Sequence, residues 1–265
     1  MKILYVGDVM GEMGLQLIER LVPELRRAHN LDLVIAQAEN VTDGKGISQE
    51  DFKRLRKAGV DFCTGGNWTL HHKEIIPMLN DPVQPIIRPA NYPEGTEGLG
   101  YKYIDTRAGR VLIVSLLGHI VGKDADKPTN NPLQIIDQIL DSQAEYPRVA
   151  TVVNFHGDYS SEKVVIGHYL DERVTMVVGD HWHVPTADAK VLPRGTAHIT
   201  DVGMCGALDA SLGVTFDSVI PRWRDGKQTR NVLAETGRKQ FNAVLVTVDP
   251  QTGLARSIEQ IQQTI

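Results

Sequence analysis

Seven side chains that can bind a metal ion stand next to short apolar segments of the sequence. They are carboxylates, amides and imidazoles, namely Asp8, Glu39, Asn40, Asn67, His156, His181 and His183. Each has an ordinary explanation when taken alone, since an aspartate after a strand can cap a helix and a single histidine is usually a core residue. His181 and His183 are more informative, because alternate residues of an extended segment point the same way and can face one site. Together the seven would be costly to bury without a cation, so we expect a metal site.

The number and chemistry of these ligands favour two ions. Seven ligands exceed one tetrahedral site, and oxygen and imidazole ligands without a cysteine cluster suit iron, manganese or zinc rather than a structural zinc site. A carboxylate can bridge two ions about 3.5–4 Å apart, the separation used by two-metal phosphoesterases. Glu39 is central in the set and is the candidate bridge. The expected cofactors are two divalent or trivalent ions, iron or manganese first, with zinc as the alternative.

Alternating apolar runs and amphipathic segments must position these side chains. The patterns predict strands over 2–7, 32–38, 60–64, 111–117, 149–155 and 174–178, helices over 14–28, 51–58, 132–143 and 160–170, and an antiparallel pair within 241–260. A run of prolines predicts a long irregular loop over 80–100. The βαβαβ order of the first third predicts an α/β fold with a mostly parallel sheet. Five strands would then deliver the seven ligands to one sheet edge, where the crevice of such folds lies.

Composition restricts the partners. The formal net charge of −5 disfavours duplex nucleic acid, which is bound through a lysine and arginine footprint, but it is compatible with a small phosphodiester or nucleotide held by metal. Cys63 and Cys205 lie far apart and predict neither a disulfide framework nor a zinc knuckle. The sequence contains no apolar stretch of ~20 residues and no signal segment, so we expect one cytoplasmic domain over 1–265 without membrane contact. The sequence is compatible with a homo-oligomer as well as with a monomer.

A nucleotide-binding loop is the rival interpretation of the N-terminal segment. Gly7, Gly11 and Gly14 do not have GxGxxG spacing, and no GK[ST] follows. Asp8 would also repel a phosphate unless a cation lay between them. If the chain were instead an NAD- or ATP-dependent enzyme, its cofactor binding should survive treatment with EDTA.

Six segments of the chain resemble one known family. They are GDVMG (7–11), AEN…GKG (38–46), GGN (65–67), NFHGDYSSEK (154–163), GDHWHVPTAD (179–188) and ITDVGMCG (199–206). Over most of residues 1–215 they are similar to the YmdB-like metallophosphoesterases. The resemblance implies a calcineurin-like α/β sandwich with central mixed β-sheets flanked by helices, and a dinuclear phosphodiesterase associated with cyclic-nucleotide hydrolysis. It also implies that Asp8, Asn40 and His183 bind one ion, that Asn67, His156 and His181 bind the other, and that Glu39 bridges them.

The chain departs from the family pattern beside its asparagine ligand. The family has GNH, whose histidine is taken as the proton donor to the leaving group, whereas this chain has Gly66-Asn67-Trp68. Tryptophan has one N–H donor and does not titrate near neutral pH. Trp68 could stack on a nucleobase or simply pack. His71 and His72 follow about one turn later and are candidates for a replacement acid, or else surface histidines.

Other polar residues near these segments have weaker assignments. Asp180 and Trp182 stand where the family has small hydroxyl residues, which indicates a reshaped pocket. Asp188 and Asp201 are either turn residues or partners that hold histidines in one tautomer. We expect Ser160 to cap the following helix. Asp124, Asp126 and Lys127 have the composition of a solvated loop.

The predicted activity is hydrolysis of phosphodiesters, with cyclic nucleotides of the 2′,3′ or 3′,5′ type as substrates. A metal-bound hydroxide would attack phosphorus in line, with Glu39 and Trp68 beside the reacting group. His71, His72 or solvent would protonate the departing alkoxide. The alternative, from a different class, is a catalytically impaired regulatory protein that binds metal or nucleotide and has lost the acid.

Overall fold

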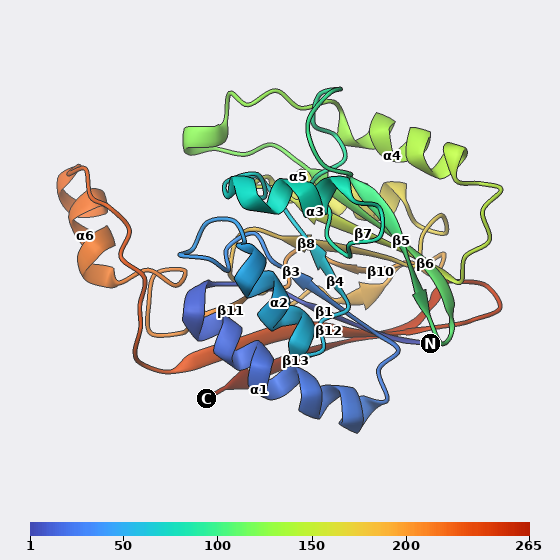
Figure 1. Ribbon diagram of the computed structural model, residues 1–265, viewed down its shortest axis with the longest axis horizontal. Coiled ribbons are helices and arrows are strands. Elements are labelled where there is room, and N and C mark those ends of the chain that lie inside the picture. The colour runs from blue at the N-terminus through green and yellow to red at the C-terminus, as the bar shows by residue number, and fades with distance from the viewer.

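Two β-sheets pack face to face in the computed structural model, which describes residues 1–265, and helices cover their outer faces (Figure 1). The helices α1 (Gly11–His29) and α2 (Gln49–Lys57) pack on one sheet. The helices α4 (Pro132–Ser142) and α5 (Ser160–Tyr169) pack on the other. Three large apolar clusters fill the interfaces of this four-layer arrangement. No helix is both long and apolar enough to cross a bilayer.

The first sheet is mixed. Its strand order is β2 (Asp8–Val9), β11 (Met204–Ala207), β12 (Lys239–Val248), β1 (Lys2–Val6), β3 (Leu33–Gln37) and β4 (Phe62–Thr64), and β13 (Ala255–Thr264) also pairs with β12. The strands β1, β3 and β4 are parallel to one another, whereas β12 runs antiparallel to β1. All five residues of β3 are buried, as expected for a parallel strand covered on both faces.

The second sheet is also mixed. Its order is β5 (Tyr101–Thr106), β6 (Gly109–Leu117), β7 (Ala150–His156), β8 (Met176–Asp180), β10 (Ala197–Ile199) and β9 (Lys190–Val191). The four central strands are parallel, and the two edge strands are antiparallel to their neighbours. The carboxyl ends of β7 and β8 therefore lie together at one end of the sandwich.

Local sequence explains several helix ends. The Ser48 side chain accepts a hydrogen bond from the Asp51 amide and starts α2, and Asn131 caps α4, whose first residue is Pro132. The short helix α3 (Ile76–Asn80) follows a 3-10 turn over Lys73–Ile75. Ser160 was predicted as the cap of α5, which is wrong: Tyr159 precedes that helix and its side chain forms no capping hydrogen bond.

The predicted fold class is confirmed, as are the predicted helices and the six single strands, with ends displaced by a few residues. The antiparallel pair near the C-terminus is β12 and β13. The strands of the first third are parallel as predicted, but the sheet that contains them is mixed, because β12 returns beside β1 in the opposite direction. One expectation is wrong: the ligand-bearing strands belong to two sheets rather than one, since β1, β3 and β4 lie in the first and β7 and β8 in the second.

One segment stands apart from the sandwich. Helix α6 (Phe216–Asp225) lies on an arm at the left of the molecule, and its Trp223 is 83% exposed (Figure 1). The sequence patterns did not predict this helix. The base of the arm reaches the body through a small apolar cluster that joins Val214 and Val219 to Met10 and Met204.

Candidate metal centre

The seven predicted ligands meet at one end of the sandwich. Asp8, Glu39, Asn40 and Asn67 follow or begin strands of the first sheet, His156 ends β7, and His181 and His183 follow β8. Asp8, Glu39 and His156 are 0%, 1% and 0% exposed, so polar groups concentrate in a place closed to solvent. The side chains are thus brought together by the contact between two sheets.

One group joins three of these residues. Nε2 of His183 lies 3.2 Å from Nδ2 of Asn40 and 4.0 Å from Oδ2 of Asp8. Nδ2 of Asn40 lies 3.5 Å from Oδ1 of Asp8. The backbone amide of His181 donates to Oδ2 of Asp8 over 3.0 Å. Asp8, Asn40 and His183 are the residues for which the family resemblance implies one shared ion.

A second group surrounds His156. Its Nε2 lies 2.9 Å from Oε1 of Glu39 and 3.0 Å from Oδ1 of Asn67. The rings of His156 and His181 have centroids 4.4 Å apart. Ligand atoms of Glu39, His156 and His181 all lie within 4.8 Å of one another. Glu39 is therefore next to the residues predicted for the second ion, and in the chain it directly precedes Asn40 of the first group.

Unpaired polar atoms fit a cation in this place. Oε1 of Glu39 is buried and accepts no hydrogen bond. It faces Nε2 of His156 at 2.9 Å, and this nitrogen carries a lone pair rather than a proton when Nδ1 of the same ring donates to Asp180. Leaving a buried carboxylate oxygen without a partner is unfavourable, and a bound cation removes that penalty. The donor set of carboxylate, amide and imidazole suits iron, manganese or zinc. The residues present therefore fit a metal centre.

The pKa shifts of groups in the cluster also favour a bound cation. Burial raises the pKa of the Asp8 carboxyl, and the nearby carboxylate of Asp180 raises it further. Burial lowers the pKa of His183 to about 4, which keeps this imidazole in the neutral form that binds metal. Burial alone would lower the pKa of His156 too, but Glu39 and Asp180 raise it overall. A bound cation would reduce the repulsion among the buried carboxylates of this cluster.

The backbone that carries the two histidines is in an unusual conformation. His181 and His183 have φ angles of 104° and 62°, in the left-handed region that costs a non-glycine residue roughly 1–3 kcal/mol. Asp201 fixes this segment, because its carboxylate accepts hydrogen bonds from the amides of Trp182 and Gly203. Of the two roles predicted for Asp201, the structure supports the turn residue rather than a partner of a histidine ring, because its carboxylate holds the backbone and pairs with Lys163.

Asp188 likewise holds a turn. Its carboxylate accepts hydrogen bonds from the hydroxyls of Thr186 and Thr200 and from the Thr200 amide. Of the two roles considered for this residue, the structure supports the turn. It contributes to the cluster only by keeping the chain after the two histidines in place.

Gly66 leaves room for the ligands. A Cβ atom at this position would lie 2.5 Å from Oε2 of Glu39 and would also overlap the ring of His156. The amide of Trp68, two residues later, donates to Oε2 of Glu39 over 2.8 Å. The glycine before Asn67 therefore allows Glu39 and His156 to approach the chain.

Asp180 is a functional residue whose role the sequence did not reveal. Its Oδ1 lies 2.7 Å from Nδ1 of His156, and its Oδ2 accepts hydrogen bonds from Tyr5, Gln37 and Asn154. Both oxygens are thus engaged, so Asp180 orients the His156 ring rather than offering a free ligand atom. A carboxylate directly before the two histidines was the only signal in the sequence.

Asp124 is the second such residue, and the expectation of a solvated loop is wrong for it. It is 7% exposed, and its Oδ2 accepts a hydrogen bond from Nδ2 of Asn67 over 2.9 Å. This bond turns the amide oxygen of Asn67 toward His156. Lys127 is exposed, as predicted, and its ammonium lies 3.0 Å from Oδ1 of Asp124.

Asp158 lies beside the ring of His181, as Asp180 lies beside the ring of His156. Its Oδ2 lies 3.3 Å from Nε2 of His181 and accepts a hydrogen bond from the Val121 amide. Its backbone oxygen accepts from the indole of Trp182. The loop after β7 thereby supports the segment after β8.

The three candidates for substrate contact or proton donation lie beside the cluster. The ring centroids of Trp68 and His71 lie 5.6 Å apart in an edge-to-face arrangement, and those of His71 and His72 lie 5.1 Å apart in the same arrangement. Nε2 of His72 is buried without a hydrogen-bond partner. Partial burial, then His72 and nearby lysines, lower the pKa of His71. The roles proposed for these three residues stay predictions.

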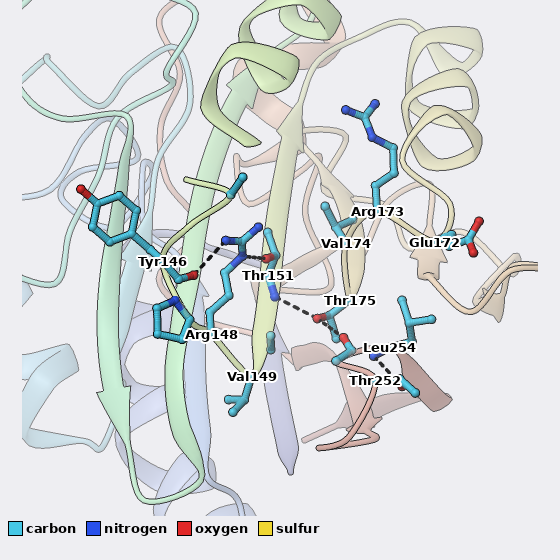
Figure 2. A pocket seen from close by; sticks show the side chains of 14 residues that line it. Tyr146, Arg148, Val149, Thr151, Glu172, Arg173, Val174, Thr175, Thr252 and Leu254 are labelled. Carbon is cyan, nitrogen blue, oxygen red and sulfur yellow. Dashed lines mark hydrogen bonds between the residues drawn. The ribbon is translucent and has the colours of Figure 1, made fainter. Parts of the chain in front are cut away.

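A cavity of about 330 Å³ lies at the opposite end of the second sheet, before β7 and β8 (Figure 2). Arg148 donates there to the Thr151 hydroxyl and to the Tyr146 carbonyl, and Thr175 donates to the Gly253 carbonyl. Arg173 on its rim pairs with Asp137. The polar groups of this cavity are thus committed to one another, and none of the seven ligands lines it.

Comparison with known proteins agrees with this arrangement. A family model described as YmdB-like protein matches residues 4–261. A Bacillus subtilis protein named 2′,3′-cyclic-nucleotide 2′-phosphodiesterase is 36% identical to the chain, over 98% of the chain and 96% of that protein.

Two solved structures are similar. A crystal structure described as a novel phosphatase from Mycoplasma pneumoniae has a TM-score of 0.91 and 30% identity, and the match covers 100% of the chain and 93% of that structure. A 5′-nucleotidase precursor from Thermus thermophilus has a TM-score of 0.60 and 13% identity, covering 100% of the chain and 54% of that structure. The second likeness concerns the fold alone.

Proposed function

The chain belongs to the YmdB-like protein family, and on this premise we propose that it is a dinuclear-metal phosphodiesterase acting on cyclic nucleotides. The 2′,3′-cyclic class is favoured by the name of the Bacillus subtilis relative, with the 3′,5′-cyclic class second. The observation that carries the proposal is the buried Glu39 carboxylate, whose Oε1 lacks a hydrogen bond amid imidazole and amide ligands. A small nucleotide is the partner, and we propose that the protein works in the cytoplasm.

The roles of the residues follow from their positions. Asp8, Asn40 and His183 would hold one ion, Asn67, His156 and His181 the other, and Glu39 would bridge. When bound, a pair of cations lowers the pKa of water toward ~7 and neutralises phosphate oxygens. Asp180 and Asp124 keep His156 and Asn67 oriented through the bonds described above. The protein thus contributes a ligand frame whose side chains are oriented by its own hydrogen bonds.

Protonation of the leaving group is the step for which the chain has no clear side chain. Trp68 stands at the position of the usual acid and cannot titrate. His71, His72 or a water molecule would then donate the proton. A missing general acid lowers the rate about 10²–10⁴-fold for a poor leaving group. The proposed enzyme should therefore be slow on alkoxide leaving groups and fast on activated ones.

A direct assay tests the proposal. The purified protein is incubated with adenosine 2′,3′-cyclic phosphate and, separately, adenosine 3′,5′-cyclic phosphate, after chelation and after addition of manganese, and the products are separated by chromatography. We expect metal-dependent opening of the ring, lost in Glu39→Gln and kept in Asp171→Asn. Asp171 is a matched control, because it is buried and its carboxylate accepts hydrogen bonds from the amides of Arg194 and Thr196. Absence of turnover in the metal-loaded protein would refute the proposal.

The alternative is a regulatory protein that binds metal or nucleotide without turnover, and the replacement of the acid by Trp68 is the observation in its favour. Hydrolysis of a chromogenic diester with added manganese separates the two. Such an ester needs no general acid, so an intact cluster should hydrolyse it. Tight nucleotide binding without any hydrolysis of this ester would favour the regulatory protein.

A further inference from the structure

A small cavity lies beside the metal centre. Its volume is about 320 Å³, and it is lined by Asn67, Trp68, Leu70, His71, Tyr92 and Lys127. Asn67 is one of the seven ligands, and the Trp68 amide bonds Glu39. The cavity therefore adjoins the centre through Asn67 and Trp68.

Positive charge gathers around Trp68, which lines this cavity together with Lys127. The ammonium of Lys45 lies 4.7 Å from the centroid of the Trp68 ring, and that of Lys127 lies 5.6 Å from it. Partial burial and His72 lower the pKa of His71 first, and the charges of Lys45, Lys123 and Lys127 add to that effect. Three lysines are thus close enough to His71 to lower its pKa, in a chain whose net charge is −5.

These cations are incompletely neutralised by the protein. Lys127 pairs with Asp124, whose carboxylate is shared with Asn67. Neither Lys45 nor Lys123 has a carboxylate within 4.0 Å, in contrast to Lys163, which is fully buried and paired with Asp201. The ammonium of Lys45 donates to no protein acceptor, although this side chain is only half-exposed, and its one hydrogen bond is made by the backbone amide to the Thr42 carbonyl. An ammonium held over an aromatic ring with free donors is suited to binding an oxyanion.

The anion bound there is distinct from the one at the metal centre. None of the seven ligands forms a hydrogen bond or ion pair with Lys45 or Lys127, and both ammonium groups lie over the Trp68 ring rather than beside Glu39. A ligand that fills both places carries two anionic groups separated by about one side chain.

We propose that Lys45 and Lys127, whose ammonium groups both lie near the Trp68 ring, form a subsite for a second phosphate of the substrate. This inference rests on the proposed function and narrows the substrate to a cyclic nucleotide with a further phosphate, such as one on its 5′ carbon. Lys45 supplies unpaired donors, Lys127 supplies charge at the outer rim, and the indole fixes the Lys45 ammonium. The second phosphate is not altered in the reaction, since it only positions the substrate.

The test compares two substrates in each variant. Adenosine 2′,3′-cyclic phosphate and its 5′-phosphorylated form are assayed with the manganese-loaded enzyme. We expect kcat/KM to be about tenfold higher for the 5′-phosphorylated form, the order expected of one charge-assisted contact. The ratio should fall toward one in Lys45→Gln, fall partly in Lys127→Gln, and persist in Lys53→Gln, whose exposed lysine lies on α2 without an ion pair. Because the ratio is taken within each variant, general damage to the cluster cancels.

A binding measurement separates this inference from the proposed function. Calorimetric titration with adenosine 3′-phosphate and adenosine 3′,5′-bisphosphate, both stable, gives the effect of the second phosphate without turnover. Tighter binding of the bisphosphate, lost in Lys45→Gln, supports the subsite even if neither cyclic nucleotide is hydrolysed, in which case only the proposed function fails. Equal affinities, or a preference that both lysine variants retain, overturn the subsite whether or not the ring is opened.

Discussion

Oδ1 of Asp180 lies 2.7 Å from Nδ1 of His156, and Tyr5, Gln37 and Asn154 all donate to the other oxygen of this carboxylate. The contact joins β8 to β7 and reaches the first sheet through Tyr5 and Gln37. With Nδ1 protonated and held, Nε2 of His156 is left to face Glu39 and Asn67. The ring of His156, one of the proposed ligands, is thus oriented by contacts within the protein.

Removing the charge of Asp180 should therefore weaken metal binding. In Asp180→Asn the amide can donate to Nδ1 and favour the tautomer with its proton on Nε2. We expect a loss of about 10–100-fold in metal affinity, the usual effect of an outer-sphere partner. Competition with a fluorescent chelator measures it. Asp171→Asn serves as the control and should keep the affinity of the parent; an unchanged affinity in Asp180→Asn would refute the orienting role.

Restoring the missing acid should change one class of substrate only. In Trp68→His we expect hydrolysis of an unactivated dinucleotide to rise at least tenfold, because a general acid contributes about 10²–10⁴-fold to such reactions. Hydrolysis of bis-p-nitrophenyl phosphate should hardly change, since its leaving group needs no proton. Steady-state rates on the two esters give the comparison. Trp223→His, at an exposed tryptophan of α6, is the control. Parent enzyme that cleaves both esters at equal rates would contradict the missing acid.

The buried pair of Lys163 and Asp201 predicts a large effect on stability. The Lys163 ammonium donates to Asp201 and to the Asp180 carbonyl, and it lies 4.1 Å from the centroid of the Trp182 ring. In Lys163→Met the Asp201 carboxylate stays buried without its counter-charge, which typically costs about 3–5 kcal/mol in the free energy of unfolding. Chemical denaturation measures this loss. The double variant with Asp201→Asn should recover part of it, because no buried charge remains; a double variant less stable than Lys163→Met would contradict this account.

A buried histidine away from the metal centre predicts how stability depends on pH. Burial lowers the pKa of His198, whose Nδ1 donates to the Val177 carbonyl. Below the unfolded-state pKa of about 6.5, the unfolded chain binds a proton that the folded chain does not, so stability falls as the pH falls. In His198→Gln the free energy of unfolding should lose about 1 kcal/mol less between pH 7 and pH 5.5. Denaturation of the chelated protein measures it, with His29→Gln as the control; equal pH dependence in parent and His198→Gln would show that His198 titrates normally.

The sequence was most informative about the side chains that end strands. Glu39, His156 and the pair His181 and His183 could be chosen because an apolar run that stops at a polar ligand is a local pattern. The same pattern does not say which sheet a strand joins. The ligands were therefore expected at one sheet edge, whereas β3 and β7 belong to different sheets.

Contacts between distant segments account for what the sequence did not reveal. Asp180 owes its role to partners from β1, β3 and β7, and Asp124 owes its role to Asn67, which lies 57 residues away in the chain. The charged loop around Asp124 has a composition typical of solvent exposure. Helix α6 contains Pro221, a residue that argues against a helix interior, and only its Ser218 and Val219 are buried.

The central claim is that the seven side chains hold two cations, and anomalous scattering from crystals of the manganese-loaded protein tests it most directly. We predict two anomalous peaks, one beside Asp8, Asn40 and His183 and one beside Asn67, His156 and His181, with the Glu39 carboxylate between them. In crystals of Glu39→Gln grown in the same way at least one peak should disappear. Parent crystals with no peak near these residues, or with the imidazoles of His156 and His183 turned away from them, would contradict the claim.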